Sequence, residues 1–174
     1  VDSRGENTIV VVQGANAHVT LPVGDVEPRV VVTQNEIPPA AQQEAVALAA
    51  RAGARLVINA APAPESPPPW YGIADPLVVN EHEAAQLATS DETGSELLRR
   101  LRERTGARSV VMTLGGRGAL VDDGAEVHAI PPVVVEQVVD ATGAGDTFVG
   151  VLAARLARGD GVVAAASAAN RCAA

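Results

Sequence analysis

Short runs of valine, leucine and isoleucine recur along the chain, separated by glycines, prolines, polar residues or alanine-rich stretches. A short apolar run bounded by turn residues is typical of a buried strand. On this basis we predict strands over residues 8–13, 30–33, 55–59, 77–80, 109–114, 119–121, 127–130 and 134–139.

The stretches between these runs predict helices. Residues 39–51 have proline near their start, alanine throughout and Gly53 just past their end, a pattern that favours a helix. Residues 94–105 place three leucines on one side and arginines elsewhere, as an amphipathic helix does. Further helices are predicted over residues 81–88, 144–158 and 162–174.

Valine-rich strands that alternate with helices indicate a mostly parallel sheet covered on both faces, a three-layer α/β/α sandwich. The Pro-rich stretch 60–72 is too short to divide two domains, so we expect residues 1–174 to form one α/β domain. Ligands of such sheets bind beyond the carboxyl ends of the strands. The residues that follow each strand are therefore the candidates for function.

The composition narrows the class of protein. The net charge is −8, and no cluster of basic residues forms a stripe, so no nucleic-acid partner is expected. One cysteine fits a reducing compartment, and no apolar run is long enough to span a membrane. We expect a soluble, cytoplasmic protein with no membrane partner. The three histidines are scattered and lack the spacing of a zinc site.

Residues 140–148, DATGAGDTF, lie where a strand is predicted to give way to a helix. Gly143, Ala144 and Gly145 leave the backbone bare, so an anion can approach the amides at the helix N-terminus. Asp146 follows in the first turn. An anion hole beside a carboxylate suits phosphoryl transfer, in which positioning and electrostatics supply most of the catalysis. The alternative is a tight turn whose aspartate only favours the helix dipole.

Two further segments follow predicted strands. In NEHE, Asn80 and Glu83 could hold a hydrated Mg²⁺, which prefers oxygen ligands, or they could form an ordinary capping box. In TLGGRG, residues 113–118, the glycines let the backbone approach a ligand or turn into a hairpin. The second segment is not a Walker P-loop, because no GK[ST] follows.

Together these motifs resemble the PfkB carbohydrate kinase family, the ribokinase-like sugar kinases. DATGAGDTF is similar to the family's C-terminal signature, with Ala141 where threonine is usual, and VVNEHEAAQL and VVMTLGGRGALV match two further segments. Stretches within residues 5–16, 31–38 and 57–65 extend the resemblance over nearly the whole chain. The resemblance implies the ribokinase-like fold and an ATP-dependent sugar kinase that uses Mg²⁺ and is activated by K⁺.

The resemblance also implies residue roles. Asp146 would be the catalytic base, and the backbone of residues 142–145 would be the anion hole. Asn80 and Glu83 would organise Mg²⁺ and the phosphates through water, and Glu36 would contact the sugar. The nucleotide would be bound by Thr113, Gly115, Gly118 and Asn170, the last near the adenine. A monovalent cation, usually K⁺, would lie at Asp140 and Thr142. Without the family match, Glu36 would read as a solvated carboxylate after a strand.

The chain departs from the family pattern at both ends. It begins about a third of the way through the family's length, without the glycine-rich sugar-binding motif and the β lid, and it stops before the last segment. We therefore expect a fragment with an exposed sheet edge, and a homodimer remains possible. The sugar is left open among family members, and a nucleotide-binding module without turnover is an alternative of another class. A Rossmann dehydrogenase is disfavoured, because no G-x-G-x-x-G opens the first strand–helix unit.

Overall fold

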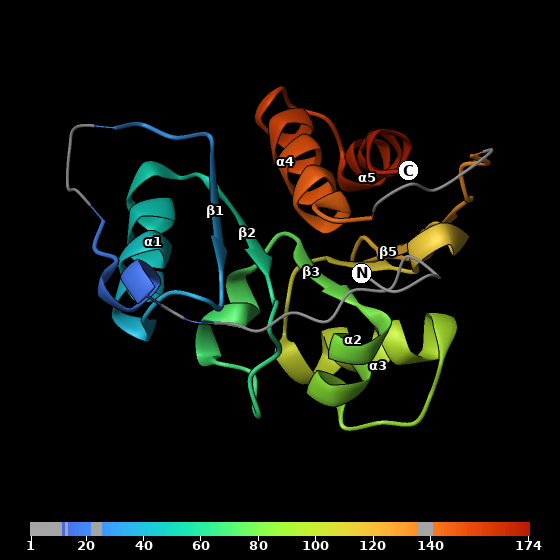
Figure 1. Ribbon diagram of the computed structural model, residues 1–174, viewed down its shortest axis with the longest axis horizontal. Helices are drawn as coiled ribbons and strands as arrows, with labels where there is room; N and C mark the ends of the chain where they lie inside the picture. The colour runs from blue at the N-terminus through green and yellow to red at the C-terminus, as the bar shows by residue number, and fades with distance from the viewer. Residues whose placement is uncertain (1–11, 13, 22–25, 136–140) are drawn as a thin grey trace.

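The computed structural model describes residues 12, 14–21, 26–135 and 141–174. Its centre is a sheet of six strands in the order β1-β2-β3-β4-β5-β6 (Figure 1). β1 to β4 run parallel, and β5 and β6 pair antiparallel to their neighbours. The strands are β1 (Val30–Gln34), β2 (Arg55–Asn59), β3 (Leu77–Asn80), β4 (Val110–Thr113), β5 (Ala119–Asp122) and β6 (Val127–Ile130).

Helices cover both faces of this sheet, so the predicted three-layer α/β/α sandwich is confirmed (Figure 1). The α-helices are α1 (Pro39–Ala52), α2 (Glu81–Ala88), α3 (Gly94–Thr105), α4 (Ala144–Ala157) and α5 (Val162–Cys172). Three short 3₁₀ helices lie before β1, between β2 and β3, and between β4 and β5: η1 (Gly14–His18), η2 (Pro69–Ile73) and η3 (Gly115–Arg117). α1, α2 and α3 share one apolar cluster with the sheet, and α4 and α5 share the other.

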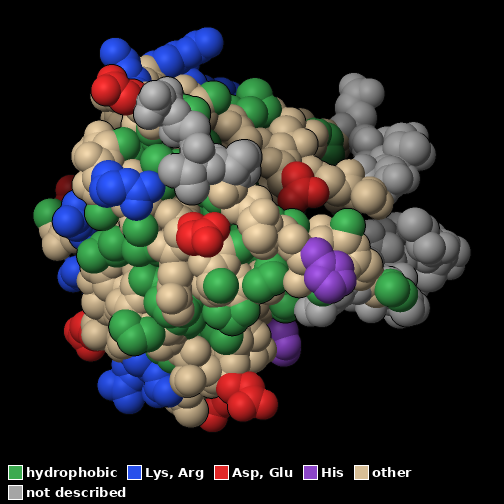
Figure 2. Space-filling view, turned by 90° about the vertical axis from the view of Figure 1, so that its left-hand side faces the viewer, with side chains coloured by type: hydrophobic (Ala, Val, Ile, Leu, Met, Phe, Trp, Pro, Cys, Tyr) green, Lys and Arg blue, Asp and Glu red, His purple; other side chains and the backbone are tan. Residues whose placement is uncertain are grey.

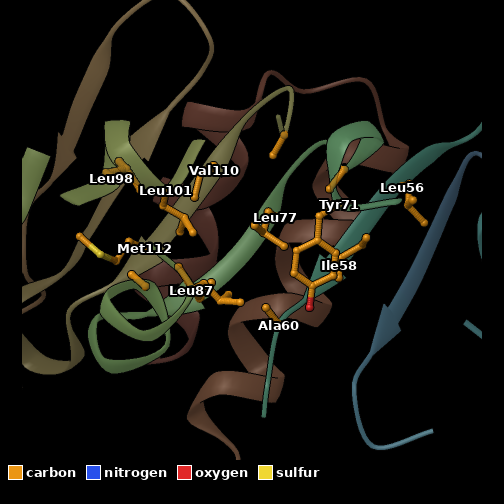
Figure 3. Packing of buried hydrophobic residues seen from close by; sticks show 14 of the residues in the cluster. Leu56, Ile58, Ala60, Tyr71, Leu77, Leu87, Leu98, Leu101, Val110 and Met112 are labelled. Atoms are coloured by element: carbon orange, nitrogen blue, oxygen red, sulfur yellow. The ribbon is translucent and has the colours of Figure 1, made fainter. Parts of the chain in front are cut away.

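The strands are apolar on both sides because each side meets a helical layer. In β3, Leu77 and Val79 belong to the cluster under α1 to α3, whereas Val78 belongs to the cluster under α4 and α5. All three side chains are buried, as expected for a parallel sheet covered on both faces. The first cluster also contains Tyr71, which lies beside Ile58 and Leu77 in Figure 3 and has no exposed surface.

Two of the predicted strands lie largely outside the described residues. Residues 134–135, the start of the predicted strand 134–139, are irregular and exposed, whereas residues 136–139 lie outside the described residues. Two consecutive prolines, Pro131 and Pro132, end β6 at Ile130, because proline has no amide to donate to a strand. The predicted strand 8–13 lies outside the described residues except for Val12, which is exposed.

The expected exposed sheet edge lies at β1. Among the described residues, β1 pairs only with β2, and Val32 at its centre is 46% exposed. On the side of the molecule shown in Figure 2, charged side chains occur at several separate places rather than in one patch. No described helix has the length and apolar character needed to cross a membrane.

Candidate functional site

A pocket of about 480 Å³ opens at the carboxyl edge of the sheet, between the turn after β4 and the start of α4. Apolar side chains, among them Val133, Val135 and Phe148, form part of its wall. Six residues singled out from the sequence also line it: Thr113, Gly115, Gly118, Ala144, Gly145 and Asn170. The fold therefore brings the glycine turn, the DATGAGDTF segment and the last helix to one place.

The glycine turn has its shape because the backbone passes very close to a neighbouring segment. Gly118 has φ of 91°, a region that glycine enters without strain. A Cβ atom added at Gly118 would lie 2.2 Å from the carbonyl oxygen of Ile130. No side chain fits there, so the turn and the end of β6 form one continuous wall of the pocket.

The opposite wall is the N-terminus of α4. Gly143 is the N-cap in the left-handed conformation, φ 80°, and offers no side-chain cap to the helix. The first amides of an α-helix have no acceptor within the helix and carry partial positive charge. Ala144 and Gly145 line the pocket here. The Ala144 amide already donates to the Ala141 carbonyl at 3.2 Å, so the anion hole predicted from the sequence would depend on the amides that follow it. Both readings of the glycines, a tight turn and an anion hole, fit this geometry.

Asp146 lies in the first turn of α4, next to this wall. Its side chain is exposed and makes no hydrogen bond or ion pair within the described parts of the chain. Asp146 is not itself among the residues that line the pocket, but it directly follows the lining residue Gly145, and its carboxylate is accessible to a ligand. Asp140, the predicted partner of Thr142 in a cation site, lies outside the described residues.

Asn80 and Glu83 form the capping box considered from the sequence. The Glu83 amide donates to Asn80 Oδ1 at 2.9 Å, and the Asn80 amide donates to Glu83 Oε2 at 2.8 Å. Burial raises the pKa of Glu83, although the hydrogen bond from the Asn80 backbone and the charge of His82 act against it. Neither residue is among those that line the pocket.

The strand register still brings this cap close to the pocket wall that the glycine turn forms. Asn80 at the end of β3 is the direct partner of Thr113 at the end of β4, whose hydroxyl donates to the Val79 carbonyl at 3.3 Å. An ion pair between Arg117 in the glycine turn and Glu81 at the start of α2 also joins the two segments.

Comparison with known proteins identifies the family of the chain. The chain matches the pfkB family carbohydrate kinases over residues 1–174. The chain belongs to the PfkB carbohydrate kinase family.

Several curated relatives in this family are named ribokinases. The chain is 38% identical over 168 residues to the bifunctional ribokinase/ribose-5-phosphate isomerase A of Fructilactobacillus sanfranciscensis, covering 90% of the chain and 30% of that protein. It is 37% identical over 170 residues to the ribokinase of Mus musculus, covering 90% of the chain and 52% of that protein. The chain thus spans about half the length of the mouse relative, and less of the bifunctional one.

Solved structures of PfkB kinases share the fold. The ribokinase of Thermotoga maritima superimposes with a TM-score of 0.83 at 28% identity, covering 100% of the chain and 60% of that structure. The ribokinase of Arabidopsis thaliana, solved with ribose and ATP, gives a TM-score of 0.79 at 26% identity and covers 98% and 60%.

The described residues suit a nucleotide and a hydrated Mg²⁺ better than a metal ion held directly by several side chains. No cluster of three or more His, Cys, Asp or Glu side chains able to hold a metal occurs in the described residues. One carboxylate, Glu83, suits a hydrated Mg²⁺ that arrives with nucleotide phosphates, because this ion keeps several of its waters. The apolar walls and bare backbone of the pocket suit a nucleotide.

Asn170 has a role in the pocket that the sequence did not indicate. Its side-chain amide donates to the Pro131 carbonyl at 3.0 Å, directly after the segment that Gly118 approaches. Asn170 therefore holds α5 against the pocket wall as well as facing the pocket.

Glu36 is not among the residues that line the pocket, although it follows a strand at the same edge of the sheet. It lies in the turn after β1, and β2 and β3 separate β1 from β4 in the sheet. Its side chain is exposed, and its amide donates to Gln34 Oε1. The predicted sugar contact and the pocket thus lie over different strands.

Proposed function

We propose that the chain is part of an ATP-dependent ribokinase, which transfers the γ-phosphoryl group of MgATP to the primary hydroxyl of D-ribose. The observation that carries the proposal is the pocket lined by Ala144, Gly145 and the glycine turn, with the unpartnered carboxylate of Asp146 beside it. Membership of the PfkB family and the relatives named ribokinase support the choice of reaction and of sugar.

In the proposed reaction, the Asp146 carboxylate accepts the proton of the sugar hydroxyl while the hydroxyl oxygen bonds to the γ-phosphorus. The bond from that phosphorus to the bridging oxygen breaks, and ADP leaves. The backbone amides of residues 142–145 stabilise the charge on the transferring group. Asn80 and Glu83 would hold Mg²⁺ through water, and this ion supplies positive charge to the phosphates.

The same proposal assigns the nucleotide to Thr113, Gly115, Gly118 and Asn170, and the sugar to Glu36. Thr142 and Asp140 remain the candidates for the activating K⁺. We further propose that the 174 residues form one incomplete ribokinase-like domain of a cytoplasmic kinase, because the chain spans about half the length of the mouse relative.

A second candidate is a nucleotide-binding module without turnover. The described residues form the pocket proposed for the nucleotide. In contrast, Glu36 is the one predicted sugar contact apart from the base. This imbalance favours nucleotide binding over turnover. A third is a PfkB kinase for another sugar, such as a fructokinase or a deoxyribokinase.

An ADP-release assay separates these functions. It would use the chain itself and a form extended to the length of its relatives, with MgATP, K⁺ or Na⁺, and D-ribose, D-fructose or 2-deoxy-D-ribose. We expect turnover with D-ribose in the extended form, faster in K⁺ than in Na⁺. Turnover with another sugar alone would reject ribokinase and keep the kinase. ATP binding without turnover in either form would favour the nucleotide-binding module.

A further inference from the structure

Asn35, the residue before Glu36, connects three segments at the carboxyl edge. Its backbone amide donates to the Ala61 carbonyl at 3.2 Å. Its side-chain amide donates to the Pro62 carbonyl at 2.8 Å and to the Tyr71 hydroxyl at 2.9 Å. The turn after β1 is therefore tied to the Pro-rich loop after β2 and to η2.

Tyr71 is a rigid partner for this contact. Its ring is completely buried among strand side chains (Figure 3), and its hydroxyl lies 3.3 Å from Asn35 Oδ1. Burial raises the pKa of Tyr71, the hydrogen bond to Asn35 opposes this, and the charge of Glu83 raises it further. The phenol therefore stays protonated at neutral pH and remains both a donor and an acceptor for Asn35.

The Glu36 side chain, unlike that of Asn35, is not held by hydrogen bonds to the described part of the chain. Its carboxylate makes no hydrogen bond or ion pair with the described residues, and its side chain is exposed. Its backbone amide donates to the Gln34 side chain. The residue before it, Asn35, is held by the Pro62 carbonyl and the Tyr71 hydroxyl. The position of the carboxylate is thus determined by the backbone of the turn rather than by contacts of its own.

We propose that Asn35, braced by Tyr71, is a positioning residue that orients Glu36 toward the sugar. The inference rests on the proposed function, in which Glu36 contacts the sugar, and it adds a residue that no motif indicated. Asn35 acts through Glu36 and does not touch the nucleotide-side pocket. Its loss should therefore weaken sugar binding selectively.

The test is steady-state kinetics of the extended, active kinase with Asn35→Ala and Tyr71→Phe. A hydrogen bond in a partly buried site contributes about 1 kcal/mol, so we expect the KM for ribose to rise about fivefold in Asn35→Ala and less in Tyr71→Phe. The KM for ATP should stay within about twofold of wild type, because no hydrogen bond in the nucleotide-side pocket is removed. Tyr71→Phe keeps the buried ring and so separates the hydroxyl contact from folding.

Gln86→Ala is the matched control. Gln86 donates its side-chain amide to the Ala63 carbonyl at 3.1 Å, so it anchors the same Pro-rich loop from α2 without contacting the Glu36 turn. We expect no change in the KM for ribose. An increase equal to that of Asn35→Ala would show that Asn35 only stabilises the loop, and would overturn the inference.

Glu36→Gln separates failure of the inference from failure of the proposed function. If Glu36→Gln raises the KM for ribose and Asn35→Ala does not, the positioning role is wrong and the sugar contact stands. If Glu36→Gln leaves that KM unchanged, the sugar contact is wrong, and the positioning role falls with it.

Discussion

The two edges of the central sheet use the same kinds of polar side chain in different ways. At the amino edge, carboxylates are paired: Asp75 with Arg55 at 2.9 Å and with the Ser109 hydroxyl at 2.6 Å, and Asp122 with Arg102 at 2.9 Å. At the carboxyl edge, Asp146 is exposed and has no partner among the described residues. The residues that line the pocket beside it have no charged side chain, although Arg117 in the glycine turn pairs with Glu81 nearby.

This difference separates residues that stabilise the fold from residues that are available to a ligand. A partly buried carboxylate must be paired to offset its desolvation, and once paired it contributes to folding. An exposed carboxylate beside a helix N-terminus contributes little to folding and can accept a proton. Substitution of the carboxylate at the carboxyl edge should therefore change activity, whereas substitution of the paired carboxylates at the amino edge should change stability.

The largest expected effect is that of Asp146→Asn in the extended kinase. The amide cannot act as a general base, so kcat should fall by about 10²–10⁴-fold, as is typical when such a group is lost. The melting temperature should stay at the wild-type value, because the carboxylate has no partner among the described residues. Near-normal turnover of the variant would show that Asp146 is not the base.

The second effect concerns the shape of the carboxyl edge. Gly118→Ala places a methyl group 2.2 Å from the Ile130 carbonyl and forces alanine to φ 91°, so the free energy of unfolding should fall by about 1–3 kcal/mol. Gly116→Ala is the control. It lines the same pocket, but its added Cβ meets no atom within 4 Å. Denaturant unfolding would measure both, and equal stabilities would contradict the close approach of Gly118 to β6.

The third effect lies at the amino edge. Asp75→Asn removes the charge that Arg55 and Ser109 bind, which should lower the free energy of unfolding by about 1–2 kcal/mol for a half-buried group. The kcat of the folded enzyme should not change. Asp91→Asn, an exposed loop residue, is the control and should alter neither quantity. A loss of turnover in Asp75→Asn without loss of stability would contradict the division between the edges.

The Asp75 effect should depend on pH. Burial raises the pKa of Asp75, but the hydrogen bonds from Arg55 and Ser109 and the charges of Arg55 and Arg108 together lower it below the usual 3.8. Its stabilising contribution is therefore complete above the unfolded-state value and is lost as the pH falls through the lower folded-state value. The stability difference between wild type and Asp75→Asn should shrink below about pH 3.8.

Much of the fold follows from local sequence signals. The predicted bounds of β2, β3, β6, α2 and α3 agree with the structure. All of these elements except β2 end at a glycine, a proline or a helix cap. Contacts between distant segments could not be predicted in this way. The register of Asn80 with Thr113 and the bond between Asn35 and Tyr71 depend on how whole strands and loops pack.

In the candidate site too, local features could be predicted from the sequence and contacts between distant segments could not. Glycine turns and a helix start can be recognised locally, and these residues line the pocket. Val135, which lines the pocket, lies in a segment that was predicted to be a strand from residue 134, because valines alone do not reveal whether a segment pairs or turns toward a pocket. The roles assigned to Asp146, Glu36 and the Mg²⁺ residues remain predictions for the kinetic tests.

The smallest expected effect is at the turn between β5 and β6, which also lies at the amino edge. Backbone amides of Glu126 and Ala125, followed by the His128 side chain 2.9 Å away, lower the pKa of Asp123 to about 2 from 3.8. Because the folded-state value is the lower one, Asp123 stabilises the hairpin above about pH 3.8, and this contribution is lost as the pH falls toward 2. An NMR titration of the Asp123 carboxyl carbon should therefore have its midpoint near pH 2.

Asp123→Asn should remove only a small, salt-sensitive part of the stability, since the carboxylate is exposed. A midpoint at the ordinary value would mean that partnered carboxylates at this edge are confined to the half-buried Asp75 and the buried Asp122. The contrast between the two edges would then depend on burial rather than on pairing alone.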